Sequence, residues 1–472
     1  MSKRWIDFIK ERKEYFLLGA ILVFGFLLRV YQLGNAPLWV DEATSTMAAK
    51  MILENGLPVL DSGWYYSSAY VLHYLMAFFL LFGQTEFFAR FISVVFGLLT
   101  IVLAYFIGKE YSKSGGIISA LFFAVFYLEV FFSRQARYYQ LFQLAFFASL
   151  YFLYKSKENP KWLYPVIIAF FIAIDTHLEA LVLAPFFILH ILYYTRRQWF
   201  LSILPAIPLI RKLIPASGLS TGSVNVVSDY ASKYFSYTTN MLYLLILFIP
   251  GLILGFLKKK RLTTTLVIPA IATLIGIFSL QTFAFRYVYF FVFLILLYSS
   301  VLLAIIYDKY GKLILIPLFL LIIIPSNLFF PLTYVNVIVP INYNFNDASA
   351  PYTDYKAVPV EIITQLKSNT TLISYYSSDV EFYIRKPDYV LPFSMTGIGD
   401  DQISINNSIG EVVDRYSGAL ILSEGPNKPY NLIADGFSVS KLKTNQREFF
   451  ENLTRGCEVG YAANDLRVYS CA

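Results

Sequence analysis

Long apolar segments alternate with short polar segments over most of the chain, up to about residue 332. A helix needs about 20 predominantly apolar residues to cross a bilayer, so this pattern predicts a polytopic α-helical membrane protein with about eleven spans. Two of the expected spans fit this pattern less well, because 162–175 is short and 199–216 contains Arg211 and Lys212. The expected spans are 15–28, 90–108, 116–132, 138–154, 162–175, 178–194, 199–216, 240–257, 262–281, 286–306 and 312–332.

Basic residues in the loops predict the side of the membrane on which each loop lies. Several Lys and Arg precede the first apolar segment, so the positive-inside rule places the N-terminus in the cytoplasm. We interpret that segment as a span rather than a cleaved signal peptide, because further spans follow it. The apolar run 70–82 contains His73 and is too short to span. If 70–82 is a helix at the outer surface, the basic residues of all later loops stay in the cytoplasm, and 34–89 forms one external loop.

The composition changes after about residue 332, where Asn, Asp and Ser replace the apolar segments. We therefore expect a membrane domain at 1–332 and a small external α/β domain at 333–472. Within the second domain the pattern predicts a helix at 361–367 and strands at 371–376, 419–422 and 466–470.

Two further features fit an external C-terminal domain. The two cysteines of the sequence, Cys457 and Cys471, flank a predicted hairpin and are expected to form a disulfide. Asn-x-Ser/Thr sequons occur at Asn369, Asn406 and Asn452, although such tripeptides are frequent in a segment rich in Asn and Ser.

Composition and charge exclude several classes of function. The chain is 57% hydrophobic and only 15% charged, whereas a soluble domain carries about 25% charged residues. The net charge of +7 resides mostly in short loops, without a basic stripe interleaved with aromatic residues, so we expect no nucleic-acid partner. The three histidines are scattered along the chain, so we expect no bound metal and no cofactor.

Charged residues gather at the ends of the expected spans that face outward. They are Arg29, Arg90, Arg134, Arg137, Asp175, His177, Glu179 and Arg286. Charged groups at membrane depth are costly and tend to mark functional sites. Alternatively, each arginine extends toward lipid phosphates at the interface. A cluster of arginines suits a lipid-linked phosphate, because the guanidinium fork matches the phosphate oxygens.

The sequence APLWVDEATST places two adjacent carboxylates, Asp41 and Glu42, directly after Trp39 in the external loop. A carboxylate can remove the proton from an attacking hydroxyl group, and arginine can stabilise a departing phosphate. Together, these residues indicate sugar transfer from a polyprenyl phosphate to a hydroxyl. Trp39 can stack on a sugar or belong to the aromatic belt at the membrane interface.

Five segments in order resemble the GT-C superfamily of membrane glycosyltransferases, the relatives of protein O-mannosyltransferases and of the enzyme that transfers aminoarabinose to lipid A. The resemblance covers roughly residues 15–330. The segments are RVYQLGNAPLWVDEATSTMAAKMILENG (29–56), FGQTEFFARFISVVFG (82–97), FFSRQARYYQLF (131–142), DTHLEA (175–180) and FRYVYFF (285–291).

The resemblance implies a GT-C fold with surface helices in the first external loop and an inverting transfer from a polyprenyl or dolichyl phosphate, without metal. It makes the first-loop acid the catalytic base, which corresponds to Asp41 with Glu42 as its neighbour. We expect Arg90, Arg137, Tyr138 and Arg286 to bind the donor phosphate, and Trp39, His177 and Tyr287 to contact the substrates. The sequence lacks the Trp-Trp-Asp motif of oligosaccharyltransferases, and SSAYVLHYL (67–75) lacks the prolines found in relatives of the aminoarabinose enzyme, so the acceptor site differs.

Other functions stay open at this point. A transporter or flippase of a lipid-linked sugar is the main alternative, and it requires charged or broken spans at mid-membrane. A non-catalytic scaffold is another. The expected partners of the enzyme are the lipid-linked donor, membrane lipids, and an acceptor hydroxyl on a glycan, a lipid or a protein. A basic membrane domain rich in Tyr and Ile with an external tail carrying sequons is typical of an archaeal surface.

Overall fold

The computed structural model describes residues 3–60, 65–194, 196–213, 242–278, 285–311, 356, 358–367, 372–374, 378–385, 389–390, 420–424, 457–463 and 466–470. The chain forms two compact units. The first unit comprises Met1–Leu33, Ser68–Leu72 and Arg90–Phe345, and the second comprises Gly34–Ser67, His73–Ala89 and Asn346–Ala472. Most of the expected external loop thus belongs to the same unit as the C-terminal region.

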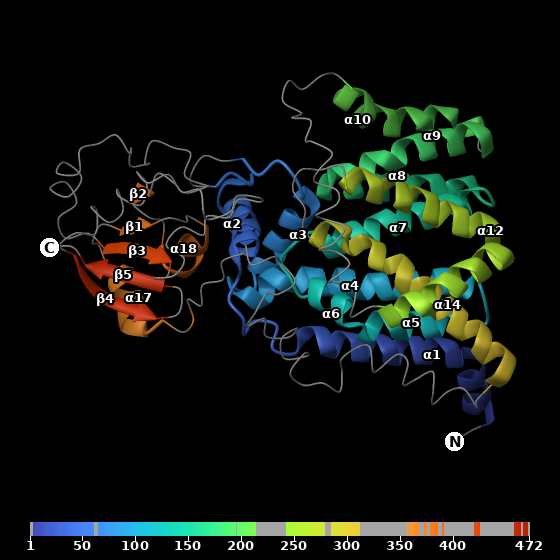
Figure 1. Ribbon diagram of the computed structural model, residues 1–472, viewed down its shortest axis with the longest axis horizontal. Helices are drawn as coiled ribbons and strands as arrows, with labels where there is room; N and C mark the ends of the chain where they lie inside the picture. The colour runs from blue at the N-terminus through green and yellow to red at the C-terminus, as the bar shows by residue number, and fades with distance from the viewer. Residues whose placement is uncertain are drawn as a thin grey trace. The chain divides into compact units, whose positions relative to one another are not determined.

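The first unit consists of helices that lie alongside one another (Figure 1). Helix α12 packs on α14, α7 packs on α8, and α5 packs on both α1 and α14. The helices are α1 (Lys3–Val30), most of α4 (Glu86–Lys109), α5 (Gly115–Val125), α6 (Tyr127–Phe132), α7 (Tyr139–Ser156), α8 (Leu163–Thr176), α9 (Leu183–Tyr194), α10 (Ile203–Leu213), α12 (Leu242–Phe278), α13 (Phe285–Val288) and α14 (Val292–Tyr310), with 3₁₀ turns η1 (Pro160–Trp162), η2 (Leu178–Val182), η3 (Arg196–Ser202) and η5 (Tyr289–Phe291).

Several expected spans differ in detail from the helices observed. The span 116–132 is divided into α5 and α6 at Phe126, whose backbone is extended (φ −66°, ψ 129°). The spans 240–257 and 262–281 form the single element α12, which has non-helical backbone at Lys259. Among the described residues, three segments have the length and hydropathy of a membrane span: Glu86–Lys109, Leu244–Ile277 and Arg286–Tyr310. The span 312–332 lies outside the described residues, so the expected number of spans stays a prediction.

Helices α12 and α14 approach each other closely because glycines face α14. A Cβ atom on Gly251 would lie 1.9 Å from the carbonyl oxygen of Tyr298, and one on Gly255 would lie 2.7 Å from the Tyr298 ring. Small residues at helix contacts let backbones approach and gain van der Waals packing, which stabilises helix pairs within a membrane.

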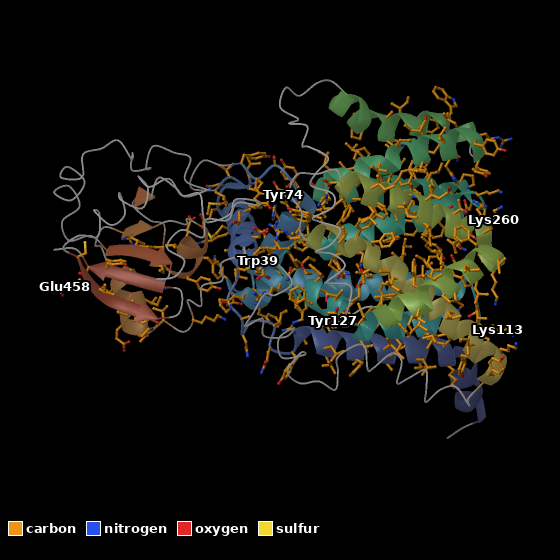
Figure 2. The ribbon with its side chains drawn as sticks, in the orientation of Figure 1. Trp39, Tyr74, Lys113, Tyr127, Lys260 and Glu458 are labelled. Carbon is orange, nitrogen blue, oxygen red and sulfur yellow. The ribbon has the colours of Figure 1, made fainter. Side chains whose placement is uncertain are left out.

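Basic residues gather at one end of the first unit. Figure 2 shows Lys113 and Lys260 at this end, and Tyr127 away from it. Glu110 pairs there with Lys155 and, at 3.9 Å, with Lys259. This separation is the one that the positive-inside rule predicts for a membrane protein.

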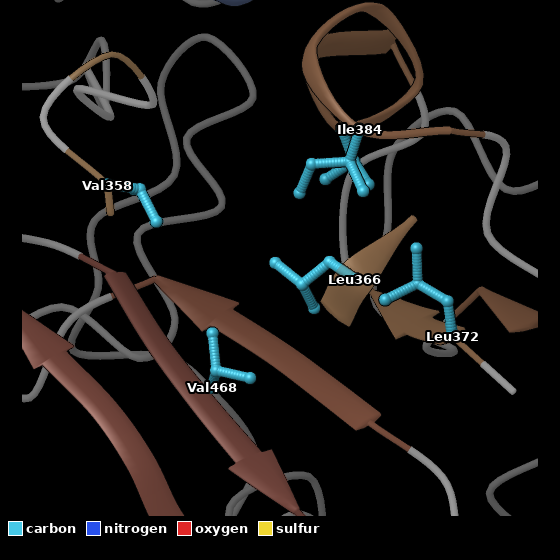
Figure 3. Close-up of a cluster of buried hydrophobic side chains, with 6 residues drawn as sticks. Val358, Leu366, Leu372, Ile384 and Val468 are labelled. Atoms are coloured by element: carbon cyan, nitrogen blue, oxygen red, sulfur yellow. The ribbon is translucent and has the colours of Figure 1, made fainter. Parts of the chain in front are cut away.

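The second unit contains α2 (Val40–Asn55), most of α3 (Tyr70–Leu80), α17 (Val360–Leu366), α18 (Ser378–Tyr383) and a sheet with the strand order β2-β1-β3-β5-β4. Strand β1 is parallel to β2 and β3, and β5 is antiparallel to β3 and β4. Figure 3 shows the apolar side chains that pack between the helices and the sheet, among them Leu366, Leu372 and Val468. The strands are β1 (Leu372–Ser374), β2 (Tyr389–Val390), β3 (Leu420–Glu424), β4 (Glu458–Ala463) and β5 (Leu466–Ser470).

The C-terminal hairpin is present as expected. Strands β4 and β5 are antiparallel, with Glu458 opposite Ser470. Cys457 is disulfide-bonded, and Cys471 is the only other cysteine in the sequence, although it lies outside the described residues. The structure therefore confirms the disulfide at Cys457.

Candidate functional site

The two adjacent acids lie in the first turn of α2, where negative charge is favoured by the helix dipole. Glu42 is fully buried, and its Oε2 accepts a hydrogen bond from the backbone N–H of Trp39, the N-cap residue, at 3.4 Å. Asp41 is only partly buried. Glu42 thus pairs with a backbone donor at the start of the helix, while Asp41 is the more accessible of the two carboxylates.

Residues from the C-terminal region hold the start of α2 in place. The backbone N–H of Leu38 donates to Tyr383 Oη at 2.6 Å, and Tyr383 Oη donates to Glu86 at 3.2 Å. Lys356 forms an ion pair with the same Glu86 at 2.8 Å. Helix α18 packs on α2, with Phe382 against the apolar cluster that contains Met47. The position of the acid-bearing turn therefore depends on residues more than 300 positions later in the sequence.

Five of the expected site residues come together in the first unit, from three separate segments. The guanidinium carbon of Arg137 lies 4.7 Å from the centroid of the Tyr138 ring, and that of Arg286 lies 5.3 Å from the Tyr287 ring. The His177 ring joins them, at 6.1 Å from Tyr138 and 5.5 Å from Tyr287 between ring centroids. We call these five residues the cationic–aromatic cluster.

His177 lies at a break in the chain between α8 and η2. Its backbone is extended (φ −149°, ψ 120°), and its Nδ1 contacts Glu179 Oε2. Burial lowers the pKa of His177 to about 4, which favours the neutral imidazole.

Asp175, in the last turn of α8, caps the start of α3. Its two carboxylate oxygens accept hydrogen bonds from the backbone N–H groups of Tyr70 and Val71, both at 3.0 Å. These groups belong to the first turn of α3, where backbone N–H groups without a helical partner carbonyl and the positive end of the dipole favour a carboxylate. Asp175 therefore fixes the start of the expected surface helix.

Three arginines of the same region bind the carbonyl oxygens of helix ends. Arg29 is fully buried and donates to the carbonyls of Phe123 and Ala124, both at 2.9 Å. Arg134 donates to the carbonyl of Arg29 at 2.9 Å, and Arg90 donates to that of Leu33 at 3.0 Å. Because Arg29 has no exposed surface, the alternative that it reaches lipid phosphates is wrong.

A buried polar network next to the cluster escaped the sequence analysis. Glu129 accepts from Gln143 Nε2 at 2.9 Å and from Gln140 Nε2 at 3.4 Å. Tyr289 Oη donates to Gln140 Oε1 at 2.8 Å, and its ring stacks on Phe132 with 4.0 Å between centroids. The sequence did contain a signal for this network, since a glutamate and two glutamines lie inside apolar segments. Polar groups at membrane depth need partners, so such residues indicate buried hydrogen bonds.

Within the described residues, no three His, Cys, Asp or Glu side chains lie close enough together to hold a metal ion. The cluster therefore offers two guanidinium groups, phenol groups and an imidazole to a ligand. This combination suits an anion that carries an apolar or carbohydrate group.

Comparison with known proteins finds a family that matches part of this chain. Residues 67–219 match the family described as dolichyl-phosphate-mannose-protein mannosyltransferase, a range that includes Arg90, Arg137, Tyr138 and His177. No protein of curated function matches the sequence.

Solved structures share the fold along almost the whole chain. ArnT from Cupriavidus metallidurans in the apo state has a TM-score of 0.62 and 13% identity, covering 98% of both chains. ArnT bound to undecaprenyl phosphate has a TM-score of 0.59 and 13% identity, covering 100% of this chain and 98% of that one. The Archaeoglobus fulgidus oligosaccharyltransferase, in complex with Zn and sulfate, has a TM-score of 0.53 and 13% identity, covering 86% of this chain and 68% of that one.

Proposed function

We propose that this chain is a multi-pass membrane glycosyltransferase that transfers one sugar from a polyprenyl phosphate to an acceptor hydroxyl. The match of residues 67–219 to the dolichyl-phosphate-mannose-protein mannosyltransferase family and the fold shared with ArnT support this proposal. Transfer inverts the anomeric centre and takes place at the outer face of the membrane. The convergence of Arg137, Tyr138, His177, Arg286 and Tyr287 is the observation that carries this proposal.

The cationic–aromatic cluster is proposed to bind the donor phosphate. Arg137 and Arg286 present planar forks that match phosphate oxygens and keep their charge. The phosphate is the leaving group, so negative charge grows on it as the bond to the sugar breaks, and arginine stabilises that charge. Arg90 adds a third guanidinium to the expected set. Tyr287 and His177 offer an aromatic ring and a neutral imidazole to the sugar.

Asp41 is proposed to be the catalytic base. Its carboxylate takes the proton of the acceptor hydroxyl while the hydroxyl oxygen attacks the anomeric carbon. The bond from that carbon to the phosphate oxygen breaks in the same displacement, which inverts the configuration. Glu42 holds the backbone of Trp39 and thereby orients the turn that carries Asp41. Trp39 is itself buried, so it supports this turn.

The topology and domain boundaries stay part of the proposal. We place the N-terminus and the basic end of the first unit in the cytoplasm, and the C-terminal region, from about residue 333, outside. The gathering of Lys113 and Lys260 at one end of the unit supports this orientation (Figure 2).

The decisive experiment compares cells that lack the protein with cells that carry it or the Asp41→Asn variant. Mass spectrometry of lipid-linked sugars and of glycans should show one polyprenyl-phosphate sugar accumulating, and one sugar missing from a glycan, in the deletion and in the variant. Glycans identical in all three strains would contradict the proposal. A flippase would lose the glycan in the deletion, but Asp41→Asn would restore it.

A further inference from the structure

A second group of cationic and aromatic side chains lies at the basic end of the first unit, where α7 and α9 meet α12. Helix α7 begins next to Tyr138 of the cationic–aromatic cluster and has 18 residues, which makes it about 27 Å long. The two groups therefore lie at opposite ends of the same helix. The members of the second group, which we call the basic-end site, are Tyr154, Lys157, His190, Tyr194 and Arg261.

Arg261 lies at the centre of the basic-end site and is half-buried. Its guanidinium carbon is 5.2 Å from the centroid of the Tyr154 ring and 5.4 Å from that of the Tyr194 ring. Its Nη2 donates to the backbone carbonyl of Tyr154 at 2.9 Å and thus caps the last turn of α7. In the part of the chain that the structure describes, this is the only hydrogen bond of the Arg261 side chain. A guanidinium carries five N–H groups, so most of them stay available to a ligand.

The ring of Tyr194 joins the other members of the site. The Lys157 Nζ lies 4.8 Å from its centroid, and the His190 ring lies 4.9 Å from it between centroids. The His190 Nε2 shares a hydrogen bond with Ser156 Oγ at 2.9 Å, which fixes the imidazole against the end of α7. An ammonium, an imidazole and a guanidinium therefore surround one exposed aromatic ring.

The acid at this end of the unit is engaged with other cations. Glu110 pairs with Lys155 and, at 3.9 Å, with Lys259. Among the described residues, neither Lys157 nor Arg261 pairs with a carboxylate. Two cations held on aromatic rings without an acidic partner favour an anion, and the guanidinium fork matches the oxygens of a phosphate.

The surroundings of the site indicate that it lies at the level of lipid headgroups. On α9, Leu189 and Tyr193 are 66% and 70% exposed, and Trp199 on η3 is 59% exposed. Arg197, between them in the sequence, is exposed as well. In a membrane protein, exposed apolar residues face the hydrocarbon, whereas Trp and Tyr gather at its boundary with the headgroups. A phosphate at this level belongs to a lipid rather than to a soluble metabolite.

We propose that the basic-end site binds the phosphate of an anionic phospholipid. Arg261 and Lys157 contact the phosphate oxygens, and the exposed face of α9 lies beside the acyl chains. A phospholipid with a choline headgroup binds less well, because its own cation lies against Arg261 and Lys157. The proposed orientation places this lipid in the cytoplasmic leaflet. Because the site is built from α7, α9 and α12, the bound lipid also holds the ends of these three helices together.

Native mass spectrometry of the purified full-length protein tests whether such a lipid binds. Phosphatidylglycerol and phosphatidylcholine are offered at equal concentration in detergent micelles, and the wild-type protein should retain phosphatidylglycerol preferentially. Glycerol phosphate, the headgroup without acyl chains, should not displace it. Equal retention of the two lipids would overturn the inference. Displacement by glycerol phosphate would identify a site for soluble phosphates and would overturn it as well.

Charge-removing variants test whether the basic-end site is responsible. Arg261→Gln and Lys157→Gln should each weaken the affinity for phosphatidylglycerol about fivefold, the factor that one cation contributes near an anionic lipid. Lys113→Gln is the matched control, because Lys113 is an exposed lysine at the same end of the unit and outside the site (Figure 2). Its affinity should equal that of the wild type.

The variants contradict the inference in two ways. An equal loss of affinity in all three would show a general effect of charge, and wild-type affinity in both site variants would leave the site without a role. Lys157 is exposed, so Lys157→Gln decides the question if Arg261→Gln does not fold.

Hydrogen exchange locates the bound lipid. Compared with phosphatidylcholine, phosphatidylglycerol should slow amide exchange in 157–162, 190–194 and 257–262 and leave 109–115 unchanged. Unchanged exchange in the first three segments, or an equal effect in 109–115, would overturn the inference. None of these measurements uses sugar transfer, so their outcome is independent of the proposed function.

Discussion

The neighbouring acids in the first turn of α2 have different surroundings, because their side chains point in different directions. Glu42 lies at the third helical position and turns back to the N–H of Trp39. Asp41 lies one position earlier and points elsewhere, since consecutive helical side chains diverge. The sequence predicted one of the two acids as the base. It could not predict that Glu42 caps the helix, because this depends on the residue at which the helix begins.

Asp41→Asn should lower kcat by about 10²- to 10⁴-fold, because the amide keeps the shape of the carboxylate but cannot accept the proton. Donor binding and the melting temperature should be unchanged. Glu42→Gln should reduce turnover less and change stability little, because the amide oxygen accepts the same hydrogen bond from the Trp39 N–H. Kinetics and thermal unfolding of both variants check this. Wild-type turnover in Asp41→Asn would exclude it as the base, and an inactive Glu42→Gln would exchange the two roles.

Arg137→Lys and Arg286→Lys should each raise the KM for the donor, because an ammonium group cannot replace the two-pronged guanidinium at a phosphate. The effect should be weaker on kcat than on KM. Arg197→Lys serves as the control, because Arg197 is exposed and outside the cluster. Unchanged kinetics in both cluster variants would assign these arginines to lipid anchoring instead.

At the scale of elements, the segment 285–291 matters most because it carries Arg286 and Tyr287 and is not a regular helix. It consists of a short α-helix followed by the 3₁₀ turn η5. The hydrogen bond from Tyr289 to Gln140 and the stacking of its ring on Phe132 fix this segment against α6 and α7. The buried network of Glu129, Gln140 and Tyr289 thus positions the arginine that is proposed to bind phosphate.

Tyr289→Phe should therefore raise the KM for the donor by about threefold to tenfold and destabilise the protein by about 1–3 kcal/mol, because Gln140 Oε1 loses a buried hydrogen bond. Tyr298→Phe on α14 is the matched control. The Tyr298 hydroxyl pairs with Tyr111 Oη at 3.1 Å, away from the cluster, so its loss should affect stability alone. If both variants change KM equally, the network has no specific positioning role.

Local patterns predicted many elements well. The predicted helix 361–367 appears as α17, and the predicted strands appear as β1, β3 and β5. The short strand β2 was missed because two residues give no alternation, and the division at Phe126 was missed because it interrupts a continuous apolar run. The His177–Glu179 contact was missed because it depends on an extended residue between two helices.

At the scale of the whole molecule, loop charges predict the orientation. A cysteine introduced at the exposed Ser67 should react with a membrane-impermeant thiol reagent added to intact cells, and one at the exposed Lys113 should react only after the cells are opened. The native cysteines should not interfere, since Cys457 is disulfide-bonded. Labelling of Lys113→Cys in intact cells would reverse the orientation of every later loop.

Sequence reasoning divided the chain into a membrane domain and a tail, whereas the structure groups the first external loop with the tail. Hydropathy finds apolar segments, but it carries no information about which polar segments meet. The hydrogen bonds of Tyr383 with Leu38 and Glu86 join residues that are hundreds of positions apart, and no local pattern indicates such a pair. The overall fold class was predictable, and the support of the acid-bearing turn was not.

The contact between Leu38 and Tyr383 has a consequence for biosynthesis. The two residues are 345 positions apart, and a ribosome adds roughly 5–20 residues per second. The turn that carries Asp41 therefore waits roughly 20–70 s for the partner that fixes it. During this interval the membrane helices are being inserted while the acid is not yet held. A nascent chain that ends before Tyr383 therefore lacks the hydrogen bond that holds this turn.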